Sequence, residues 1–340
     1  MALISVRHAL PRALGETGGS VLLWALIVLL FVWSAVAQTQ LFVIGLIVGS
    51  VLALGAIGLT LVYGILRFAN FAHGDMMTLG AYVALFAYSS GGDKVGPLSF
   101  GYGMIPALAL AAAAVALIAA GTDWLVFRPL RRRGSSSIVT FAIASLGVAL
   151  MVRATVLLIW GPQPQIYDPG IQLARDLPIG AKIKPDQIFI MCAAVVLIAA
   201  TYGLLYRTKL GKAMRATSDN PDLARVAGIN TAQVITWTWL IGGALVAVAG
   251  VLLGIQAQVT PDMGFTLLLP LFAATILGGI GKPHGALLGA LIVAVSQEAS
   301  TGLDLPWPPG WGPGYKPAVA FLVLMVMLIV RPRGLFGAKD

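Results

Sequence analysis

Long apolar stretches dominate this chain, and its charged residues are confined to the segments between them. No charged residue occurs within 17–66, 95–122 or 226–261. About 20 apolar residues, each adding about 1.5 Å, carry a helix across the hydrocarbon core of a membrane. The stretches are continuous and lack the alternating pattern of barrel strands, so we interpret them as helices. Several stretches fit one helix, and the longest must hold two.

This pattern predicts an all-α fold, a polytopic membrane bundle of about 8–10 transmembrane helices in a single domain over 1–340. The count depends on the first span, because Arg7 and Arg12 precede an apolar region ending in Ala35-Val36-Ala37, which resembles a signal-peptidase site. Retention gives ten helices, and cleavage gives nine. The predicted spans lie near 21–37, 41–66, 71–90, 103–127, 138–160, 187–205, 234–256, 264–281, 285–301 and 317–330.

The composition excludes a water-soluble fold. Hydrophobic residues make up 59% of the chain and charged residues only 10%, whereas soluble domains carry roughly 25% charged residues. The 40 glycines agree with a membrane bundle, since small residues let helices approach closely. The single Cys192 excludes a disulfide within the chain.

The net charge of +9 is better explained by topology than by nucleic acid, because the basic residues form no stripe with interleaved aromatics. With a cytoplasmic N-terminus, most Lys and Arg fall inside, including those within 128–133 and 207–225. Cytoplasmic loops carry this excess. We therefore expect both termini in the cytoplasm of a multi-pass protein of a bacterial inner (plasma) membrane. The basic residues expected outside are Lys94, Arg175, Lys182, Lys184 and Lys316.

The cytoplasmic segment 206–233 contains a predicted short amphipathic helix. Ser218-Asp219-Asn220-Pro221 is a helix start signal with Pro in the first turn, and Gly228 ends the helix. On the opposite side, the segment 161–186 is rich in Pro, Gly and mixed charge, and an external partner could touch it.

Polar residues at the start of the third span are candidates for a functional site. Asn70, His73 and Asp75 are costly beside hydrocarbon, so we expect them to face the bundle interior, a cavity or the cytoplasmic boundary. The alternative is a capped helix start near the interface, with Asn70 as the cap and Arg67 close by.

A second candidate region is the glycine-dense block 273–290, which contains Thr275. Glycines this dense can interrupt a helix and expose backbone groups able to bind a polar solute. Close helix packing alone also requires them, so both interpretations stay open.

Two further ionisable residues, Arg153 and Glu298, fall within predicted spans. An intramembrane charge is a functional-site candidate. Both lie toward the external ends of their helices, where snorkelling or a vestibule position explains them equally well.

No motif supports an enzyme. The chain lacks the P-loop pattern, since Gly281-Lys282-Pro283 fails at the residue after Lys, and it lacks Gly-x-Ser-x-Gly, His-Glu-x-x-His and Cys-x-x-Cys. His8, His73 and His284 offer no close metal-ligand spacing. We therefore expect no catalytic residue, no metal and no cofactor in this chain.

Several blocks of sequence, taken in order, resemble the LivH-type permeases of branched-chain amino-acid ABC importers. A set of ordered blocks is more specific than any single block. At one matched position, Asp75 stands where Glu is commoner in that family, a conservative change that does not separate substrates. The blocks are Gly49–Gly64 continuing into Asn70–Asp75, Gly211–Ala216 with Asp222–Gly228, Leu277–Gly289 and Arg331–Gly337, and together they run from about 41 to 337.

The resemblance implies that this chain forms the translocation path of a heteromeric importer for branched-chain amino acids. The implied partners are a second, LivM-like permease, two cytoplasmic ABC ATPases that bind ATP and Mg, a periplasmic solute-binding protein and membrane lipid. The helix in 206–233 would be the coupling helix that docks on an ATPase, with an ordinary solvated loop as the alternative. The expected coupling residues are Asn220, Asp222, Leu223, Arg225, Val226 and Gly228, and the expected path residues are Asn70, His73, Asp75 and Thr275.

Two other functions stay open. Permeases for urea and short amides resemble the same family, whose binding proteins carry most of the substrate discrimination. An ion-coupled secondary transporter is the alternative from a different class. The scarcity of buried carboxylates argues against it, because such a transporter needs its own ion-coupling site.

Overall fold

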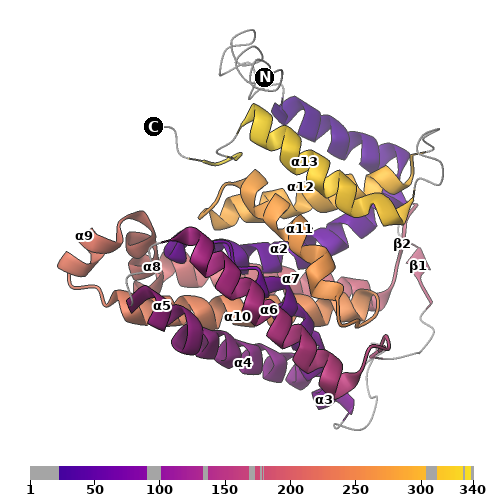
Figure 1. Ribbon diagram of the computed structural model, residues 1–340. Helices are drawn as coiled ribbons and strands as arrows, with labels where there is room; N and C mark the ends of the chain where they lie inside the picture. Colours follow the sequence, from indigo (N-terminus) through magenta and orange to yellow (C-terminus); the bar gives the residue numbers. More distant parts are fainter. Residues whose placement is uncertain are drawn as a thin grey trace.

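The computed structural model describes residues 23–89, 101–132, 137–167, 173–176, 178, 180–303, 312–331 and 334–337. The described residues are almost entirely helical (Figure 1), which confirms the all-α expectation. The helices are one over Leu23–Ala37, α2 (Thr39–Leu66), α3 (Ala72–Ser89), α4 (Met104–Thr122), α5 (Arg128–Arg132), α6 (Ile138–Trp160), α7 (Pro185–Arg207), α8 (Lys209–Asp219), α9 (Pro221–Val226), α10 (Thr231–Gln256), α11 (Met263–Gly278), α12 (Pro283–Thr301) and α13 (Lys316–Val330). A π-helical turn over Asp123–Phe127 joins α4 to α5, a 3-10 turn over Pro313–Tyr315 precedes α13, and β1 (Arg175–Asp176) pairs antiparallel with β2 (Lys182–Ile183).

Helices occupy the apolar stretches of the sequence, and the chain is a multi-pass membrane protein. Within the described ranges, six helical runs are long and apolar enough to cross a membrane: α2, Met104–Arg132, α6, α7, α10 and Pro313–Val330. The helix Leu23–Ala37 and α11 are apolar but shorter. α3 and α12 also lie on apolar stretches, but they carry polar residues such as Asp75 and Glu298.

α2 and α10 form the centre of the bundle. α2 packs against α12, α10, α11 and α7, and α10 packs against α4 and α3 as well. Glycine makes the closest approaches possible. A Cβ at Gly250 of α10 would overlap the carbonyl oxygen of Met77, and a Cβ at Gly45 of α2 would lie 3.0 Å from the Cα of Val295. The outer helices α4, α6, α7 and α13 instead expose large apolar side chains, as lipid-facing helices do.

The connection between α2 and α3, residues 67–71, runs through the bundle as non-helical chain. α2 ends at Arg67, whose backbone is left-handed with a φ of 56°. Phe68 is 2% exposed, and its ring packs against two other phenylalanine rings at centroid distances of 5.1 and 5.4 Å. Buried backbone outside a helix needs other hydrogen-bond partners. The hydroxyl of Ser145 provides one, because it accepts from the amide of Phe71 at 3.0 Å. α3 therefore begins inside the bundle.

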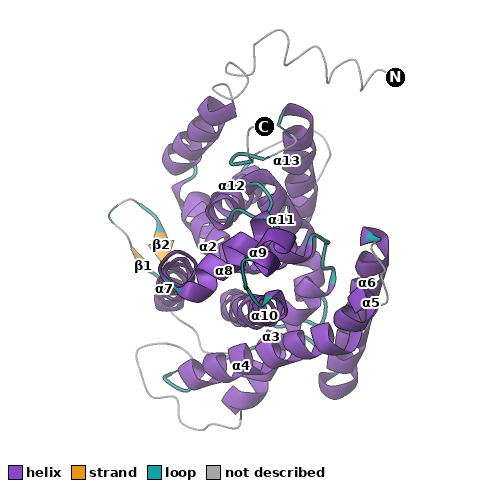
Figure 2. Cartoon of the chain, turned by 90° about the vertical axis from the view of Figure 1, so that its left-hand side faces the viewer, coloured by secondary structure: helices purple, strands orange, loops and turns teal. Residues whose placement is uncertain are grey.

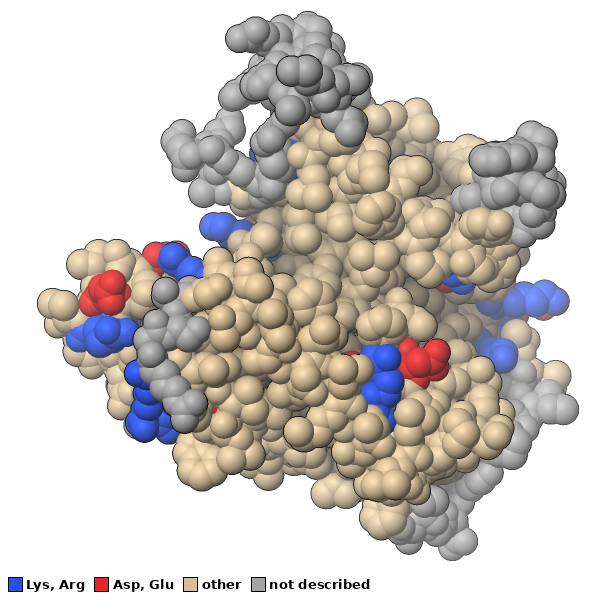
Figure 3. All heavy atoms as spheres, in the orientation of Figure 1, with Lys and Arg blue, Asp and Glu red and all other residues tan. Residues whose placement is uncertain are grey.

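Most of the charged side chains visible on the face drawn in Figure 3 lie toward the two ends of the bundle. α5, α8 and α9 lie at one end, on the left of Figure 1, and β1 and β2 lie at the opposite end. Figure 3 shows Lys and Arg at the left end and also at the right edge, while the broad middle of this face carries little charge. In Figure 2, which faces that end, α8 and α9 lie across the ends of α2 and α10, which α8 contacts. At the opposite end, the hydroxyl of Tyr167 donates to the carbonyl of Ala81 at 2.8 Å and ties its loop to α3.

Candidate functional site

Asn70 caps the start of α3 inside the bundle. Its Oδ1 accepts a hydrogen bond from the amide of Ala72 at 3.1 Å, which is the geometry of a helix cap. The side chain is fully buried, and its Nδ2 donates to no atom among the described residues. A buried polar group without a partner costs about 1–3 kcal/mol and is uncommon. Asn70 is thus a cap that keeps one donor available.

The side chains of His73 and Thr275 both lie against the same turn of α2. The Nε2 of His73 lies 2.9 Å from the carbonyl oxygen of Gly55. The hydroxyl of Thr275 lies 3.5 Å from the carbonyl oxygen of the next residue, Ala56, and donates to Leu271 of its own helix at 2.8 Å. Both side chains are 2% exposed. The fold therefore brings two predicted path residues from opposite halves of the chain to neighbouring backbone carbonyls.

Asp75 has a partner that the sequence analysis did not identify. The Nε and Nη2 of Arg153 donate to its two carboxylate oxygens at 2.9 and 3.1 Å, which joins α3 to α6. The side chain of Asp75 is 1% exposed and that of Arg153 is 22% exposed. The guanidinium also lies 4.2 Å from the ring centroid of Phe265. Arg153 is thus the counter-ion of Asp75 within the bundle.

Glu298 forms a second buried ion pair. The Nζ of Lys316 donates to its two carboxylate oxygens at 2.7 and 2.8 Å, which joins α12 to α13. The Glu298 side chain is 6% exposed. The sequence held a signal for the first pair, because Asp75 and Arg153 are opposite charges in two predicted spans and intramembrane ions pair with one another. For the second pair the signal was weaker, because Lys316 was expected just outside the last span. The sequence does not say which charges meet.

The four predicted path residues, Asn70, His73, Asp75 and Thr275, all face the bundle interior around α2 and the start of α3. Three of them have their hydrogen bonds satisfied by the protein, and Asn70 keeps a free donor among the described residues. The polar cluster is closed in this arrangement, so passage of a solute along it requires the helices to rearrange. Its role in translocation stays a prediction.

The segment 206–233 forms two short helices where the sequence predicts one. α8 begins at Thr208, whose hydroxyl accepts from the amide of Gly211 at 3.0 Å. α9 begins at Asn220, whose Oδ1 accepts from the amides of Asp222 and Leu223, both at 3.0 Å. Pro221 occupies the first position of α9, as the start signal predicts, and Gly228 follows with a φ of 83°. Local capping therefore explains where α9 begins and ends.

α9 presents apolar side chains to solvent. Leu223 is 67% exposed and Val226 is 87% exposed, whereas Ala224, on the opposite face, is 4% exposed. Asp222 and Arg225 lie beside them and form an exposed pair 3.5 Å apart. Two large aliphatic residues on a charged helix are therefore left mostly uncovered by the described residues, which is typical of a docking surface.

α8 is tied to the end of α2. The hydroxyl of Ser218 donates to the carbonyl of Gly64 at 3.0 Å. The Nη2 of Arg67 donates to the carbonyls of Ser218 and Asp219 at 3.3 and 3.4 Å. These bonds connect the predicted coupling segment to the chain that leads into Asn70. The sequence analysis missed this link, because its residues come from distant parts of the chain.

Within the part of the chain that the structure describes, no group of three or more His, Cys, Asp or Glu side chains is placed to hold a metal ion.

Comparison with known proteins places this chain in one family. The family described as "Branched-chain amino acid transport system / permease component" matches residues 41–330. The high-affinity branched-chain amino acid transport system permease protein BraD of Pseudomonas aeruginosa is 33% identical over 311 residues, 88% of this chain and 96% of that protein. The corresponding LivH of Escherichia coli (strain K12) is 31% identical over 304 residues, 87% and 94% of the two chains. A probable LivH of Methanocaldococcus jannaschii is 30% identical over 300 residues, 86% and 90%.

Proposed function

Because this chain belongs to the family of permease components of branched-chain amino acid transport systems, we propose that it forms the path by which branched-chain amino acids cross the membrane. The chain is a multi-pass inner-membrane transport subunit of an ABC system, and ATP is bound by a separate ATPase. Energy from ATP therefore has to reach the path through a contact between subunits.

The proposed assembly contains more than this chain. An ABC importer permease works with an ATPase and a solute-binding protein. We assign it here a second, LivM-like permease, two cytoplasmic ATPases and a periplasmic binding protein. Exposed apolar side chains along α6 and α7 provide surface for the second permease and for lipid.

Both termini are proposed to lie in the cytoplasm, on the side of α5, α8 and α9. The support is the basic character of that end, which carries Arg128, Arg131 and Arg132 near α5 and further basic residues along α8. Cytoplasmic segments carry such an excess of positive charge. The loop containing Tyr167 then faces the periplasm, where the binding protein docks.

The observation that carries the coupling role is the exposed apolar pair on α9. A helix of six residues is too short to be stable by itself, yet here Asn220 caps it and its bonds through α8 tie it to α2. It therefore presents Leu223 and Val226 in a defined position. Apolar anchors in a groove dominate the affinity of an interface, and rim charges such as those of Asp222 and Arg225 matter less.

The test replaces both anchors, as Leu223→Asp with Val226→Asp. The double variant should insert and fold normally, because both side chains are mostly exposed. It should lose the ATPase on purification and lose leucine uptake in reconstituted membranes. Leu173→Asp is the matched control, since Leu173 is 86% exposed in the loop at the opposite end, and this variant should keep the ATPase.

Retention of both the ATPase and ATP-linked uptake by the α9 double variant would contradict the coupling role. The contact would then lie elsewhere at this end, with Arg128 to Arg132 as the next surface to test. Uptake of urea in place of leucine by the intact transporter would instead contradict the proposed substrate.

The path itself is proposed to pass the polar cluster at the start of α3. Asn70 keeps a buried donor free, and His73 and Thr275 hold neighbouring carbonyls of α2. α3 begins inside the bundle after a non-helical connection, and broken helices of this kind form solute sites in transporters. Movement transmitted from α8 through Arg67 would reach this cluster directly.

A further inference from the structure

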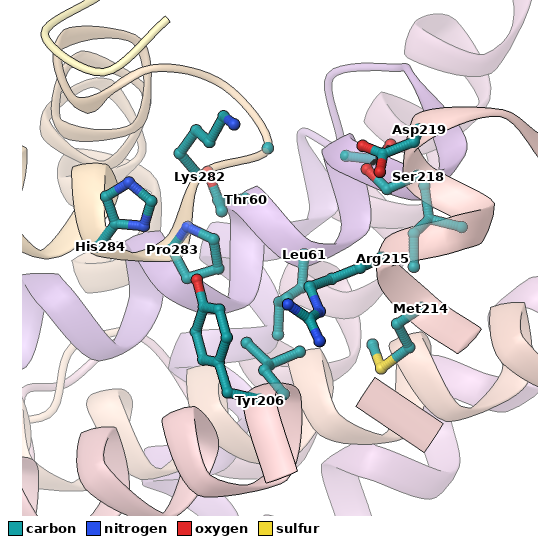
Figure 4. Close-up of a pocket in the computed structure, with 14 residues that line it drawn as sticks. Thr60, Leu61, Tyr206, Met214, Arg215, Ser218, Asp219, Lys282, Pro283 and His284 are labelled. Carbon is teal, nitrogen blue, oxygen red and sulfur yellow. Dashed lines mark hydrogen bonds between the residues drawn. The ribbon is translucent and has the colours of Figure 1, made fainter. Parts of the chain in front are cut away.

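A pocket of about 250 Å³ opens at the end of the bundle where α8 lies (Figure 4). Its walls come from the last turns of α2 and α7, from α8, and from the connection between α11 and α12. None of the predicted path or coupling residues lines it. At about 30 Å³ for each liquid water molecule, the pocket has the volume of roughly eight waters, which suits a ligand the size of a free amino acid.

The inner wall of this pocket is apolar. Leu61 is 7% exposed, and Leu205 and Met214 are each 2% exposed. Ile65 lines the same side. Burying a branched aliphatic side chain against such a wall is favourable, because apolar surface is removed from water. This wall therefore favours a ligand that carries an aliphatic group.

Charged side chains of both signs surround the mouth. Figure 4 shows Lys282 and Asp219 on opposite sides, with Arg215 between them. The guanidinium of Arg215 lies 4.9 Å from the ring centroid of Tyr206, which holds it at the wall. In the described part of the chain, Lys282, Arg215 and Asp219 take part in no ion pair. The mouth thus offers two positive charges and one negative charge to a ligand.

Thr60 adds a buried hydroxyl without a partner. It lines the pocket and is 1% exposed, and its Oγ1 makes no hydrogen bond to any described residue. Other buried threonines, such as Thr217 and Thr238, donate to the carbonyl four residues earlier in their own helix. A buried hydroxyl left unpaired is unfavourable, and a ligand with a hydrogen-bond acceptor would give it a partner.

We infer that this pocket binds the transported amino acid from the cytoplasmic side, an inference that rests on the proposed function. The aliphatic side chain of leucine, isoleucine or valine matches the wall of Leu61 and Met214. The carboxylate matches Lys282 and Arg215, and the ammonium group matches Asp219. The hydroxyl of Thr60, which lies beside Lys282 in Figure 4, can donate to the same carboxylate.

Other ligands match fewer of these features. A simple anion such as phosphate would be repelled by the carboxylate of Asp219, and it would leave the apolar wall uncovered. A simple cation would be repelled by the positive charges of Lys282 and Arg215. Only a zwitterion with an aliphatic side chain uses the wall and both signs of charge.

The position of the pocket gives its occupant a regulatory effect. A ligand that contacts both Lys282 and α8 would hold α8 against α2 and the α11–α12 connection. α8 continues through Asn220 into α9, the proposed coupling helix. A ligand shifts a population toward the conformation that it binds best. Amino acid that accumulates in the cytoplasm therefore slows further import by holding this arrangement.

The test measures initial uptake of labelled leucine by the complete transporter in proteoliposomes, with increasing unlabelled leucine on the side that faces α8. Each rate is divided by the same variant's rate without that leucine. The parent should slow as leucine rises. Lys282→Gln and Thr60→Val should each need at least about tenfold more leucine for equal inhibition, because each removes a hydrogen bond to a charged group. Lys212→Gln, on the exposed face of α8 outside the pocket, should behave as the parent.

Two ligand controls complete the design. Phosphate, and 4-methylpentanoate, which lacks the ammonium group of leucine, should inhibit far less than leucine. Equal inhibition by phosphate would overturn the inference, as would an unchanged leucine requirement in both Lys282→Gln and Thr60→Val. Uptake measured without cytoplasmic leucine tests the proposed function separately. A transporter that imports leucine but is never inhibited by cytoplasmic leucine would contradict only the inference about the pocket.

Discussion

Two of the Arg–Asp ion pairs among the described residues lie in contrasting surroundings, one inside the bundle and one in water. In the bundle, Arg153 donates two hydrogen bonds to Asp75 at 2.9 and 3.1 Å, and the Asp75 side chain is 1% exposed. On α9, Arg225 reaches Asp222 through one contact of 3.5 Å, and the two side chains are 65% and 86% exposed. The first pair joins two helices, and the second joins residues one turn apart.

Burial decides what each pair does. Two unit charges 4 Å apart attract by about 1 kcal/mol in water and by about 4 kcal/mol at an effective dielectric constant of 20. A charge left alone in the bundle has no water to solvate it, whereas a charge left alone on α9 is solvated at once. We therefore expect the pair of Asp75 to stabilise the packing of α3 on α6. We expect the pair of Asp222 to contribute little, and the apolar neighbours on α9 to matter more for docking.

The largest expected effect is that of Arg153→Met, which leaves the buried carboxylate of Asp75 without its counter-ion. Removing one partner of a buried pair destabilises a protein by about 3–5 kcal/mol. We expect a loss of this size in the free energy of unfolding in detergent, together with less inserted protein. A double variant with Asp75→Asn added should recover most of the loss, because no unpaired charge then remains. An Arg153→Met protein as stable as the parent would mean that water reaches this pair.

An intermediate effect is expected for Asn70→Leu with His73→Leu, which removes polar groups beside the buried pair and leaves both charges in place. The protein should still insert, but the initial rate of leucine uptake should fall at least about tenfold, because the solute loses its polar contacts along the path. Uptake is compared at equal ATPase content. Thr201→Val on α7, which also removes a buried hydroxyl, is the control and should transport normally. Normal uptake by the double variant would mean that Asn70 and His73 have only a structural role.

The smallest expected effect is that of Asp222→Ala with Arg225→Ala, which removes the exposed pair. Such pairs contribute less than about 0.5 kcal/mol to a helix. The double variant should keep the ATPase on purification and retain uptake within about twofold of the parent. Complete release of the ATPase would contradict this expectation, because the exposed charges, and not Leu223 and Val226, would then dominate docking.

The sequence predicted those features that depend on neighbours along the chain. The apolar stretches mark where helices form, and the start signal at Asn220 with Pro221 places α9, because a cap bonds to amides two and three residues ahead. Even here the local pattern was incomplete. The capping of α8 by Thr208 was not identified, so one helix was predicted where the structure has two.

The sequence by itself therefore determined the class of the molecule, the helices on its apolar stretches and the cap of α9, because hydrophobic length and capping act over a few residues. Only the tertiary structure decided that Arg153 meets Asp75, that Lys316 meets Glu298, and that Ser218 holds Gly64. Many helices of similar apolar length can be arranged in many ways, and apolar side chains discriminate poorly among them. Close glycine contacts and charges that cannot remain alone in the bundle select one arrangement, and both act between residues far apart in the chain.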